Sequence, residues 1–475
     1  MADPTKPPTA YPSQHPSAEQ ITALKQSGQF DADWYRARHP DVDLTGLDPA
    51  THYLRYGHRM NRDPGPGFST RFTRTVHGIR DEHEPLARLE WMRRKAGDAP
   101  VEANPKQVLM AANRVATTGD HARAIALAEA HLPADLAYTA EILRANAALA
   151  RADEGGWQQH LNAYLAHFGA APIRLETGPG AGQGTLFDRL ACAPLPPVTG
   201  GPLVSVIMPA WNAEKTVEKA ARSILNQTWR NLELLIVDDA STDGTWAVLQ
   251  RLAAGDGRVK IARNRVNVGP YVSKNLALTR AKGAWITGHD ADDWANPQRL
   301  EQHLAAAQAR NLSASLTYMI RIRPSGNLSH LGTISDFSFD GVARKASISC
   351  LFDRRILTEK LGYWDTVRFG ADSEMIMRAE TVLGNRFGVV QQISMICLEL
   401  PGSLTNDPLT GIRTETGLSP VRANYRNAWT TWLQGRSAGA HVHLDFPQKD
   451  RRYDAAPEMV VPWHDQLTNL QAANA

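Results

Sequence analysis

The chain has 475 residues, 43% of them hydrophobic and 21% charged, and its 52 Lys and Arg against 49 Asp and Glu leave a formal net charge of +3. At roughly 150 residues per domain this length predicts two or three domains, and the near-neutral balance excludes a polycation that coats nucleic acid. The 3 cysteines lie far apart without CxxC spacing, which argues against a disulfide framework or a zinc site and favours a cytoplasmic protein. No stretch approaches the roughly 20 apolar residues of a membrane-spanning helix.

The N-terminal part of the chain predicts an all-α region. Residues 1–28 begin polar and Pro-rich, without the apolar core of a secretion signal, so we expect a disordered tail. Residues 29–100 place aromatic side chains between short helical stretches and Pro/Gly stops, which predicts a small helical module. Residues 101–175 are rich in Ala and Leu, with Gly-then-helix units near the ~34-residue tetratricopeptide period. We expect a helical hairpin there that orients an acceptor or docks a protein partner.

A change of pattern marks the second half of the chain. Residues 176–201 are Gly- and Pro-rich and predict a linker. In residues 202–415 apolar, β-branched runs alternate with amphipathic helical stretches, which predicts a doubly wound α/β sheet with right-handed crossovers. The runs expected to be strands are LVSVIMPAW, LELLIVDD, VKIARN and AWITGHDADDW. Residues 416–475 predict a C-terminal helical extension.

Aspartates follow two of these expected strands. Asp238 and Asp239 end one strand. Another is followed by Asp290, Asp292 and Asp293, of which Asp290 and Asp292 form a DxD. In parallel sheets the carboxyl ends of strands meet at one crevice, where ligands bind. A DxD there suits Mg²⁺ or Mn²⁺ bridging a diphosphate, with a solvated acidic turn as the alternative. A dehydrogenase and a P-loop ATPase are excluded, because GxGxxG does not follow the first strand and GxxxxGK[ST] is absent.

An ordered series of motifs resembles the family 2 glycosyltransferases of the inverting, GT-A type. The motifs are VSVIMPAWN, SILNQTWRNLELLIVDDASTDGT, NVGPYVSKNLAL, AKGAWITGHDADDWANPQRL and LGYWDTVRFGADSEMIMRAE. The resemblance covers about residues 202–401 and implies a Rossmann-like GT-A domain with a mixed, mostly parallel sheet.

The resemblance also implies the site that binds a nucleotide-sugar donor, most often a UDP-sugar. Asp239 is expected to accept a hydrogen bond from the base, whereas Asp238 shapes the turn. Asp290 is expected near the ribose, and Asp292 is expected to ligate Mn²⁺ or Mg²⁺ on the diphosphate. Lys274 is expected to contact the phosphates, with an ordinary surface lysine as the alternative. The expected base pocket is lined by Pro209, Ala210, Trp211 and Asn212.

An inverting transfer also needs a carboxylate that accepts the proton of the acceptor hydroxyl. Family members usually carry this base as the Asp of a Glu-Asp pair that opens a helix, and here the pair reads Ala371-Asp372. Asp372 is therefore the expected base, and the missing Glu puts a second carboxylate in doubt. On the acceptor side we expect Asp293, Trp294, Trp364 and Glu374, with core packing as the alternative for the tryptophans and a helix-start charge for Glu374.

The end of the chain allows alternative interpretations. Residues 401–420 are long and polar enough to form a lid. Tyr425, Trp429 and Trp432 recur at helical spacing, which predicts packing against the catalytic domain or, alternatively, a helix on the membrane surface. His441 and His443 allow two interpretations: one of them adds a ligand to the metal site, or the two form a strand-borne pair.

The predicted function is a metal-dependent inverting glycosyltransferase of surface polysaccharide synthesis. It is expected to be cytoplasmic, with peripheral contact at the inner face of the membrane, and to act on a glycan or lipid-linked acceptor without binding nucleic acid. The alternative is a catalytically silent glycosyltransferase-like scaffold that acts through its helical N-terminal arm. A nucleotidyltransferase is disfavoured because no Gly-rich, basic triphosphate loop follows the first strand.

Overall fold

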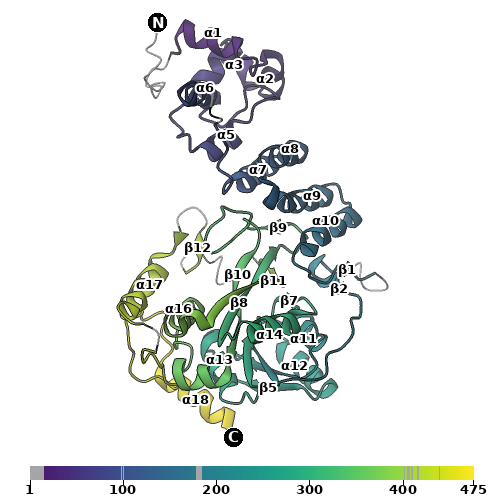
Figure 1. Cartoon of the computed structure of the whole chain (residues 1–475), viewed down its shortest axis with the longest axis vertical. Helices are drawn as coiled ribbons and strands as arrows, with labels where there is room; N and C mark the ends of the chain where they lie inside the picture. Colours follow the sequence, from purple (N-terminus) through teal and green to yellow (C-terminus); the bar gives the residue numbers. More distant parts are fainter. Residues whose placement is uncertain are drawn as a thin grey trace. The chain divides into compact units, whose positions relative to one another are not determined.

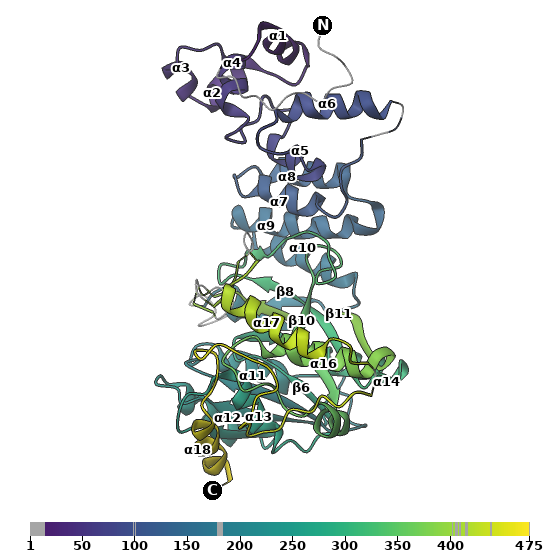
Figure 2. The same ribbon diagram turned by 90° about the vertical axis from the view of Figure 1, so that its left-hand side faces the viewer.

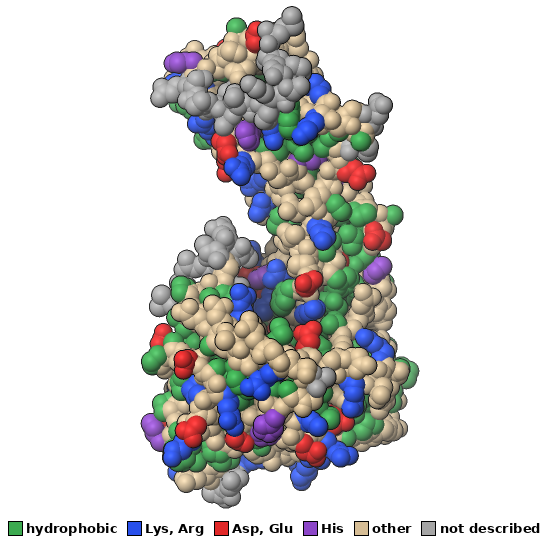
Figure 3. Space-filling model, turned by 60° about the vertical axis from the view of Figure 1, so that its left-hand side comes forward, with side chains coloured by type: hydrophobic (Ala, Val, Ile, Leu, Met, Phe, Trp, Pro, Cys, Tyr) green, Lys and Arg blue, Asp and Glu red, His purple; other side chains and the backbone are tan. Residues whose placement is uncertain are grey.

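The computed structural model divides the chain into two compact units (Figure 1). The helical unit comprises Met1–His160 with His330–Val342, and the α/β unit comprises Leu161–Ser329 with Ala343–Ala475. On the face shown in Figure 3, basic and acidic side chains are interspersed over both units. Among the described residues, none of the helices has the length and apolar character needed to span a membrane. The structure describes residues 15–97, 99, 101–177, 184–400, 402–403, 407, 410–413, 417–437 and 439–474.

The helical unit confirms the predicted all-α N-terminal region. Its first helix lies inside the segment predicted to be a disordered tail, because Ser17 and Gln20 form a capping box and Leu24 is buried in the aromatic core. That core is built around Tyr35 and Tyr53. The helices are α1 (Ala18–Gln26), α2 (Ala32–Arg38), α3 (Asp41–Leu44), α4 (Pro49–His52), the π-helical turn Tyr53–Gly57, α5 (Thr70–His77), α6 (Pro85–Ala96), α7 (Val108–Ala116), α8 (His121–His131), the 3₁₀ turn Ala134–Thr139, α9 (Ala140–Ala150) and α10 (Glu154–Ala166), which crosses the unit boundary.

The helical unit also contains a segment from the second half of the sequence, residues 330–342. The Ile334 amide donates a hydrogen bond to the Lys106 carbonyl at 2.9 Å, and the Tyr138 hydroxyl donates one to Asp340 at 3.1 Å. Burial, followed by the negative charge of Asp340, raises the pKa of the Tyr138 hydroxyl. The segment is therefore bonded to the turn before α7 and to the 3₁₀ turn Ala134–Thr139, a long-range pairing that the sequence pattern did not indicate.

The α/β unit is built on a mixed sheet in the order β5-β4-β3-β6-β10-β8-β11-β7, with β9 paired to the end of β8. The β5-β4-β3-β6 half is parallel, and β8 is parallel to β11, whereas β10 and β7 pair antiparallel with their neighbours. The predicted α/β class is confirmed. The strands are β3 (Val204–Ala210), β4 (Leu232–Asp238), β5 (Val259–Arg263), β6 (Trp285–Gly288), β7 (Asp293–Ala295), β8 (Ala314–Ile322), β9 (Leu328–Ser329), β10 (Arg344–Asp353) and β11 (Phe387–Leu398).

Helices cover both faces of this sheet, which explains the continuous apolar runs of its central strands. Val206 and Met208 of β3 pack with α11 (Val217–Leu225), α12 (Thr245–Gly255) and α14 (Arg299–Ala309). Ile207, between them, joins the core on the other face. That second face is covered by α13 (Gly269–Leu278), α16 (Ala371–Leu383) and α17 (Pro420–Leu433), and Figure 2 shows α16 and α17 in front of the central strands.

Shorter elements complete the α/β unit. Part of the predicted linker is structured, because Phe187 is buried and β1 (Ile173–Leu175) pairs antiparallel with β2 (Leu190–Cys192). The C-terminal extension packs as predicted, with Tyr425, Trp429 and Leu433 of α17 buried in the same core as α16. The remaining elements are the 3₁₀ turns Phe187–Arg189 and Gly384–Arg386, α15 (Arg354–Ile356), the π-helical turn Leu357–Leu361, β12 (Ile412–Arg413), β13 (Gly417–Leu418) and α18 (Trp463–Asn474).

A matched pair of glycines tests how the C-terminal segment is held. Gly362 has a φ of 76°, and a methyl group there would overlap the backbone of Leu444; Gly435 has a φ of 74°, with no heavy atom within 4 Å of the same position. Gly362 also has a ψ of −142°, a backbone conformation that essentially only glycine adopts, so backbone strain and the overlap together should cost Gly362→Ala about 1–3 kcal/mol of unfolding free energy beyond Gly435→Ala. Urea unfolding of the two variants measures the difference, and equal stabilities would contradict the packing described.

Candidate functional site

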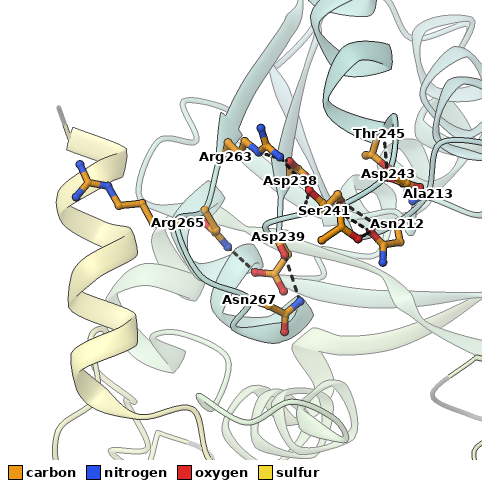
Figure 4. A network of polar contacts seen from close by, with 12 residues as sticks. Asn212, Ala213, Asp238, Asp239, Ser241, Asp243, Thr245, Arg263, Arg265 and Asn267 are labelled. Carbon is orange, nitrogen blue, oxygen red and sulfur yellow. Dashed lines mark hydrogen bonds and ion pairs between the residues drawn. The ribbon is translucent and has the colours of Figure 1, made fainter.

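The loops that leave β3 and β4 are bonded to each other at the carboxyl edge of the sheet (Figure 4). The Asn212 amide donates to Ser241 Oγ at 2.9 Å, and the Thr242 amide donates to Asn212 Oδ1 at 2.9 Å. Asn212 has a φ of 47°, a left-handed conformation that Asn tolerates better than most residues. Of the residues expected to line a base pocket, Pro209 and Ala210 end β3, and the Trp211 side chain is 59% exposed. An exposed indole therefore stands on a fixed loop.

The adjacent aspartates at the end of β4 have different partners (Figure 4). Asp238 is fully buried, accepts a hydrogen bond from the Ser241 amide at 3.2 Å and forms a 2.9 Å ion pair with Arg263. It holds the turn after β4. Asp239 instead accepts hydrogen bonds from Asn264 Nδ2 at 2.7 Å and from the Gly269 amide at 2.7 Å. Burial raises the pKa of Asp239, and these hydrogen bonds oppose the rise. Asp239 thus ties β4 to the first residue of α13.

The loop between β6 and β7 concentrates negative charge. Asp290 and Asp292 are half-buried and Asp293 is buried. Burial raises the pKa of all three carboxyls, that of Asp292 to about 6, and the charge of Asp290 raises the pKa values of Asp292 and Asp293 further. The positive charge of Lys274 opposes the rise at Asp290, and that of Arg321 opposes it at all three aspartates. The loop is therefore a compact group of carboxylates whose charge is only partly compensated.

Lys274 and Asp372 meet beside this loop. Lys274 Nζ lies 2.9 Å from Asp372 Oδ1 and 3.2 Å from Oδ2, and the Tyr271 hydroxyl donates to Oδ2 at 3.4 Å. Lys274 is 2% exposed, and its ammonium lies 4.8 Å from the centroid of the Tyr271 ring. This burial shows that Lys274 is not an ordinary surface lysine. A buried ammonium requires a charged partner, and here the partner is the Asp372 carboxylate. The negative charge of Asp372 also raises the pKa of Asp290, so the pair borders the acidic loop.

A small pocket opens at this ion pair. Trp364 supplies an aromatic wall, packing edge-on against Phe352 with ring centroids 6.2 Å apart and facing the Lys274 ammonium at 5.8 Å. The pocket combines one ion pair with an otherwise mainly apolar lining. It is lined by Ile207, Lys274, Gly288, Ser347, Ile348, Cys350, Phe352, Trp364, Asp372, Met375 and Ile376.

Other residues expected on the acceptor side lie elsewhere. Glu374 is fully buried and forms a 2.8 Å ion pair with Arg378, which also donates to the Tyr363 carbonyl. Its carboxylate belongs to the core, and we leave it out of the candidate site. Trp294 is buried in β7, and Asp293 accepts a hydrogen bond from the Leu398 amide at 3.1 Å.

Sequence reasoning missed two residues near the carboxylates. Tyr271 lies three residues before Lys274 on the same helix, so helical spacing was the available signal. Arg321 lies in β8, where an arginine inside the otherwise apolar stretch YMIRI was the signal. Its relation to the aspartates depends on strand pairing, which the sequence alone does not reveal.

The carboxylates of the β6–β7 loop suit a divalent cation. Within the part of the chain that the structure describes, no group of three or more His, Cys, Asp or Glu side chains is placed to hold a metal by itself. Asp290 and Asp292 remain as a pair of candidate metal ligands. Burial and the negative charge of Asp290 disfavour the ionised form of Asp292. A hard cation favours that ionised pair and leaves positions for phosphate oxygens.

His443 hydrogen-bonds the Thr358 carbonyl at 3.0 Å and stacks on His441.

The fold and this site define an α/β domain with a mixed sheet and with acidic residues at the carboxyl edge of its parallel strands. Residues 205–358 match the family model described as Glycosyl transferase family 2. The chain therefore carries a family 2 glycosyltransferase domain, as its motifs predicted.

Known relatives match part of the chain. EpsE of Bacillus subtilis (strain 168), named as a glycosyltransferase, is 41% identical over 109 residues, 23% of this chain and 39% of EpsE. The Escherichia coli UDP-Glc:alpha-D-GlcNAc-diphosphoundecaprenol beta-1,3-glucosyltransferase WfgD is 31% identical over 158 residues, 33% of this chain and 62% of WfgD. Among solved structures, S. aureus TarS in complex with UDP-GlcNAc is 20% identical, with a TM-score of 0.36 over 42% of this chain and 59% of that chain. The chain spans less than two thirds of the length of each of these proteins.

Replacing Glu374 separates a core role from a chemical one. Glu374→Ala leaves the buried Arg378 guanidinium without its carboxylate, which should lower the free energy of unfolding by about 3–5 kcal/mol. Glu380, exposed on the same helix, provides the control variant Glu380→Ala. Thermal and urea unfolding of both variants measure the effect. Normal stability of Glu374→Ala would contradict the assignment of Glu374 to the core.

Proposed function

We propose that the protein is a metal-dependent, inverting glycosyltransferase that moves a sugar from a nucleotide-sugar donor to a hydroxyl group. One observation carries the proposal: three separate stretches of the fold meet beside one pocket, namely the loop with Asp290 and Asp292, α13 with Lys274 and α16 with Asp372. Lys274 and Asp372 pair with each other and line the pocket, and the charges of both act on Asp290. These residues bring together carboxylates that can bind a cation, an ammonium that can bind phosphate and a carboxylate that can accept a proton. An enzyme that transfers a sugar from a nucleoside diphosphate needs these groups together.

The proposed donor is a UDP-sugar. The name of WfgD specifies UDP-Glc, and WfgD is 31% identical to this chain over 158 residues. The base would lie over the fixed loops after β3 and β4, with Trp211 and Asn212 beside it and Asp239 at the end of β4. The diphosphate would lie toward Lys274 and Asp290.

Divalent Mn²⁺ or Mg²⁺, held by Asp292 with Asp290 beside it, would supply positive charge that stabilises the departing diphosphate. The acceptor hydroxyl oxygen forms a bond to the anomeric carbon while the bond from that carbon to the diphosphate oxygen breaks. The electron pair of the broken bond stays on the diphosphate, and the hydroxyl proton passes to the Asp372 carboxylate. Attack opposite the leaving group inverts the anomeric centre.

Lys274 connects the donor and acceptor sides of this site. Without donor, its ammonium pairs with Asp372 at 2.9 Å. Diphosphate oxygens are competing anions for the same ammonium, and charge-assisted hydrogen bonds to them are among the stronger ones in proteins. Transfer of Lys274 to the diphosphate would release Asp372 to accept a proton, so donor binding would prepare the base.

The proposed acceptor is a lipid-linked glycan of surface polysaccharide synthesis, since the name of WfgD specifies a diphosphoundecaprenol acceptor. We place the protein in the cytoplasm, in peripheral contact with the membrane that carries the acceptor. The helical unit would orient the acceptor or bind a protein partner. The intact carboxylates disfavour a silent scaffold, because a scaffold has no need to hold like charges together against their repulsion.

Asp292 and Asp372 should fail in different ways. Asp292→Ala should lose the Mn²⁺-dependent part of nucleotide binding. Asp372→Asn should bind donor normally and transfer sugar at least roughly a hundredfold more slowly, the typical contribution of a general base. A screen of donor hydrolysis across nucleotide sugars, with and without Mn²⁺, together with calorimetric donor binding, measures both effects. Equal turnover by the two variants would defeat the proposal.

Lys274→Met tests the phosphate contact. Its affinity for UDP should fall roughly tenfold or more, because a charge-assisted hydrogen bond is lost, whereas its affinity for uridine should not change. Lys282→Met provides the control, because Lys282 lies just beyond the C-terminal end of α13 and its side chain is exposed. Calorimetric titration of both ligands measures the difference. Unchanged UDP affinity in Lys274→Met would show that Lys274 serves Asp372 alone.

A further inference from the structure

A row of four side chains crosses the sheet next to the acidic loop. Asp293 of β7 is paired with Cys397 of β11, Cys397 with Arg321 of β8, and Arg321 with Ser329 of β9. Paired residues on neighbouring strands direct their side chains to the same face of a sheet. The row therefore leads from the acidic loop through a guanidinium to a serine hydroxyl on one face.

A second guanidinium lies on the same face. Arg344 of β10 is paired with Met319, which precedes Arg321 by two residues on β8 and so shares its face. Burial lowers the pKa of Arg344, and the positive charge of Arg321 lowers it further. The fold thus holds two arginines close enough to repel each other.

Two polar groups in this arrangement have no hydrogen-bond or ion-pair partner among the described residues. The Arg321 guanidinium forms no hydrogen bond or ion pair within the part of the chain that the structure describes. Ser329 is 7% exposed, and its Oγ, buried from water, has no hydrogen-bond partner there. A buried hydroxyl without a partner is uncommon and suggests an absent ligand.

Charge compensation of the aspartates does not account for Arg321 completely. Its charge acts on Asp290, Asp292 and Asp293, yet it forms an ion pair with none of them. Once a divalent cation binds to Asp292, as the proposed function requires, that acidic charge is neutralised. The positive charge of Arg321 would then lack these carboxylates as counter-charges, whereas the charge of Glu399 still acts on Arg344.

We propose that Arg321, Arg344 and Ser329 bind a phosphate group of the acceptor. Guanidinium groups present parallel N–H donors that match phosphate oxygens, and the serine hydroxyl supplies another donor. The site lies on β8, β9 and β10, whereas the nucleotide is expected over the exits of β3 and β4, in the other half of the sheet. The inference rests on the proposed function and narrows it: the acceptor carries a phosphate or diphosphate close to the hydroxyl that is glycosylated.

The test uses geranyl diphosphate as the probe and geraniol as its phosphate-free counterpart. Both are titrated calorimetrically into the full-length protein saturated with UDP and Mn²⁺. Wild-type protein should bind geranyl diphosphate saturably and geraniol not at all. Arg321→Gln and Arg344→Gln should weaken this binding at least roughly tenfold, and Arg344→Gln should leave the UDP affinity and the unfolding temperature unchanged. Ser329→Ala should weaken it by a smaller factor.

Arg323→Gln is the matched control, because Arg323 follows Arg321 by two residues but is exposed and pairs with Glu399 at 3.4 Å. It should bind geranyl diphosphate within roughly twofold of wild type. Absence of geranyl diphosphate binding by the wild type, or equal binding by all variants, would overturn the site. A loss of UDP affinity in Arg344→Gln would overturn it too, by assigning Arg344 to the donor. Failure of the wild type to bind UDP at all would instead contradict the proposed function.

Discussion

The site depends on holding like charges together at the carboxyl edge of the sheet. Asp290, Asp292, Asp293 and Asp372 act on one another there, and burial opposes the ionised forms of the three in the loop. Two unit charges about 4 Å apart repel by about 4 kcal/mol at an effective dielectric constant of 20. Lys274 and Arg321 offset part of that repulsion. The remaining negative charge suits the divalent cation that we propose for the site.

The surrounding fold keeps these charges in place. Asp239 accepts hydrogen bonds from the start of α13, the helix that carries Lys274. Gly370, with a φ of 92°, begins α16 and so places Asp372 in its first turn. Apolar side chains on both faces of β3 and β4 anchor the strands from which the donor loops emerge. Backbone geometry and core packing therefore provide the rigidity that a charged site requires.

Part of this arrangement follows from the sequence and part does not. Continuous apolar runs such as LELLIVD predict strands buried on both faces, and the motif order predicts the family. The pairing of Lys274 with Asp372 brings together α13 and α16, and the position of Arg321 depends on register between strands that are not consecutive, so local pattern reveals neither. Glu374 was expected near the acceptor because it follows Asp372 by two residues, but its partner Arg378 is one helical turn away and the pair lies in the core. The binding of residues 330–342 to the helical unit likewise depends on long-range contacts.

The most direct measurement is an experimental structure of the protein with UDP and Mn²⁺, in which the anomalous signal of manganese locates the cation. The account predicts a manganese peak bonded to Asp292 and to the diphosphate, with Lys274 Nζ moved from Asp372 to a phosphate oxygen. A cation or diphosphate bound away from Asp292, with the Lys274–Asp372 pair unchanged, would contradict it.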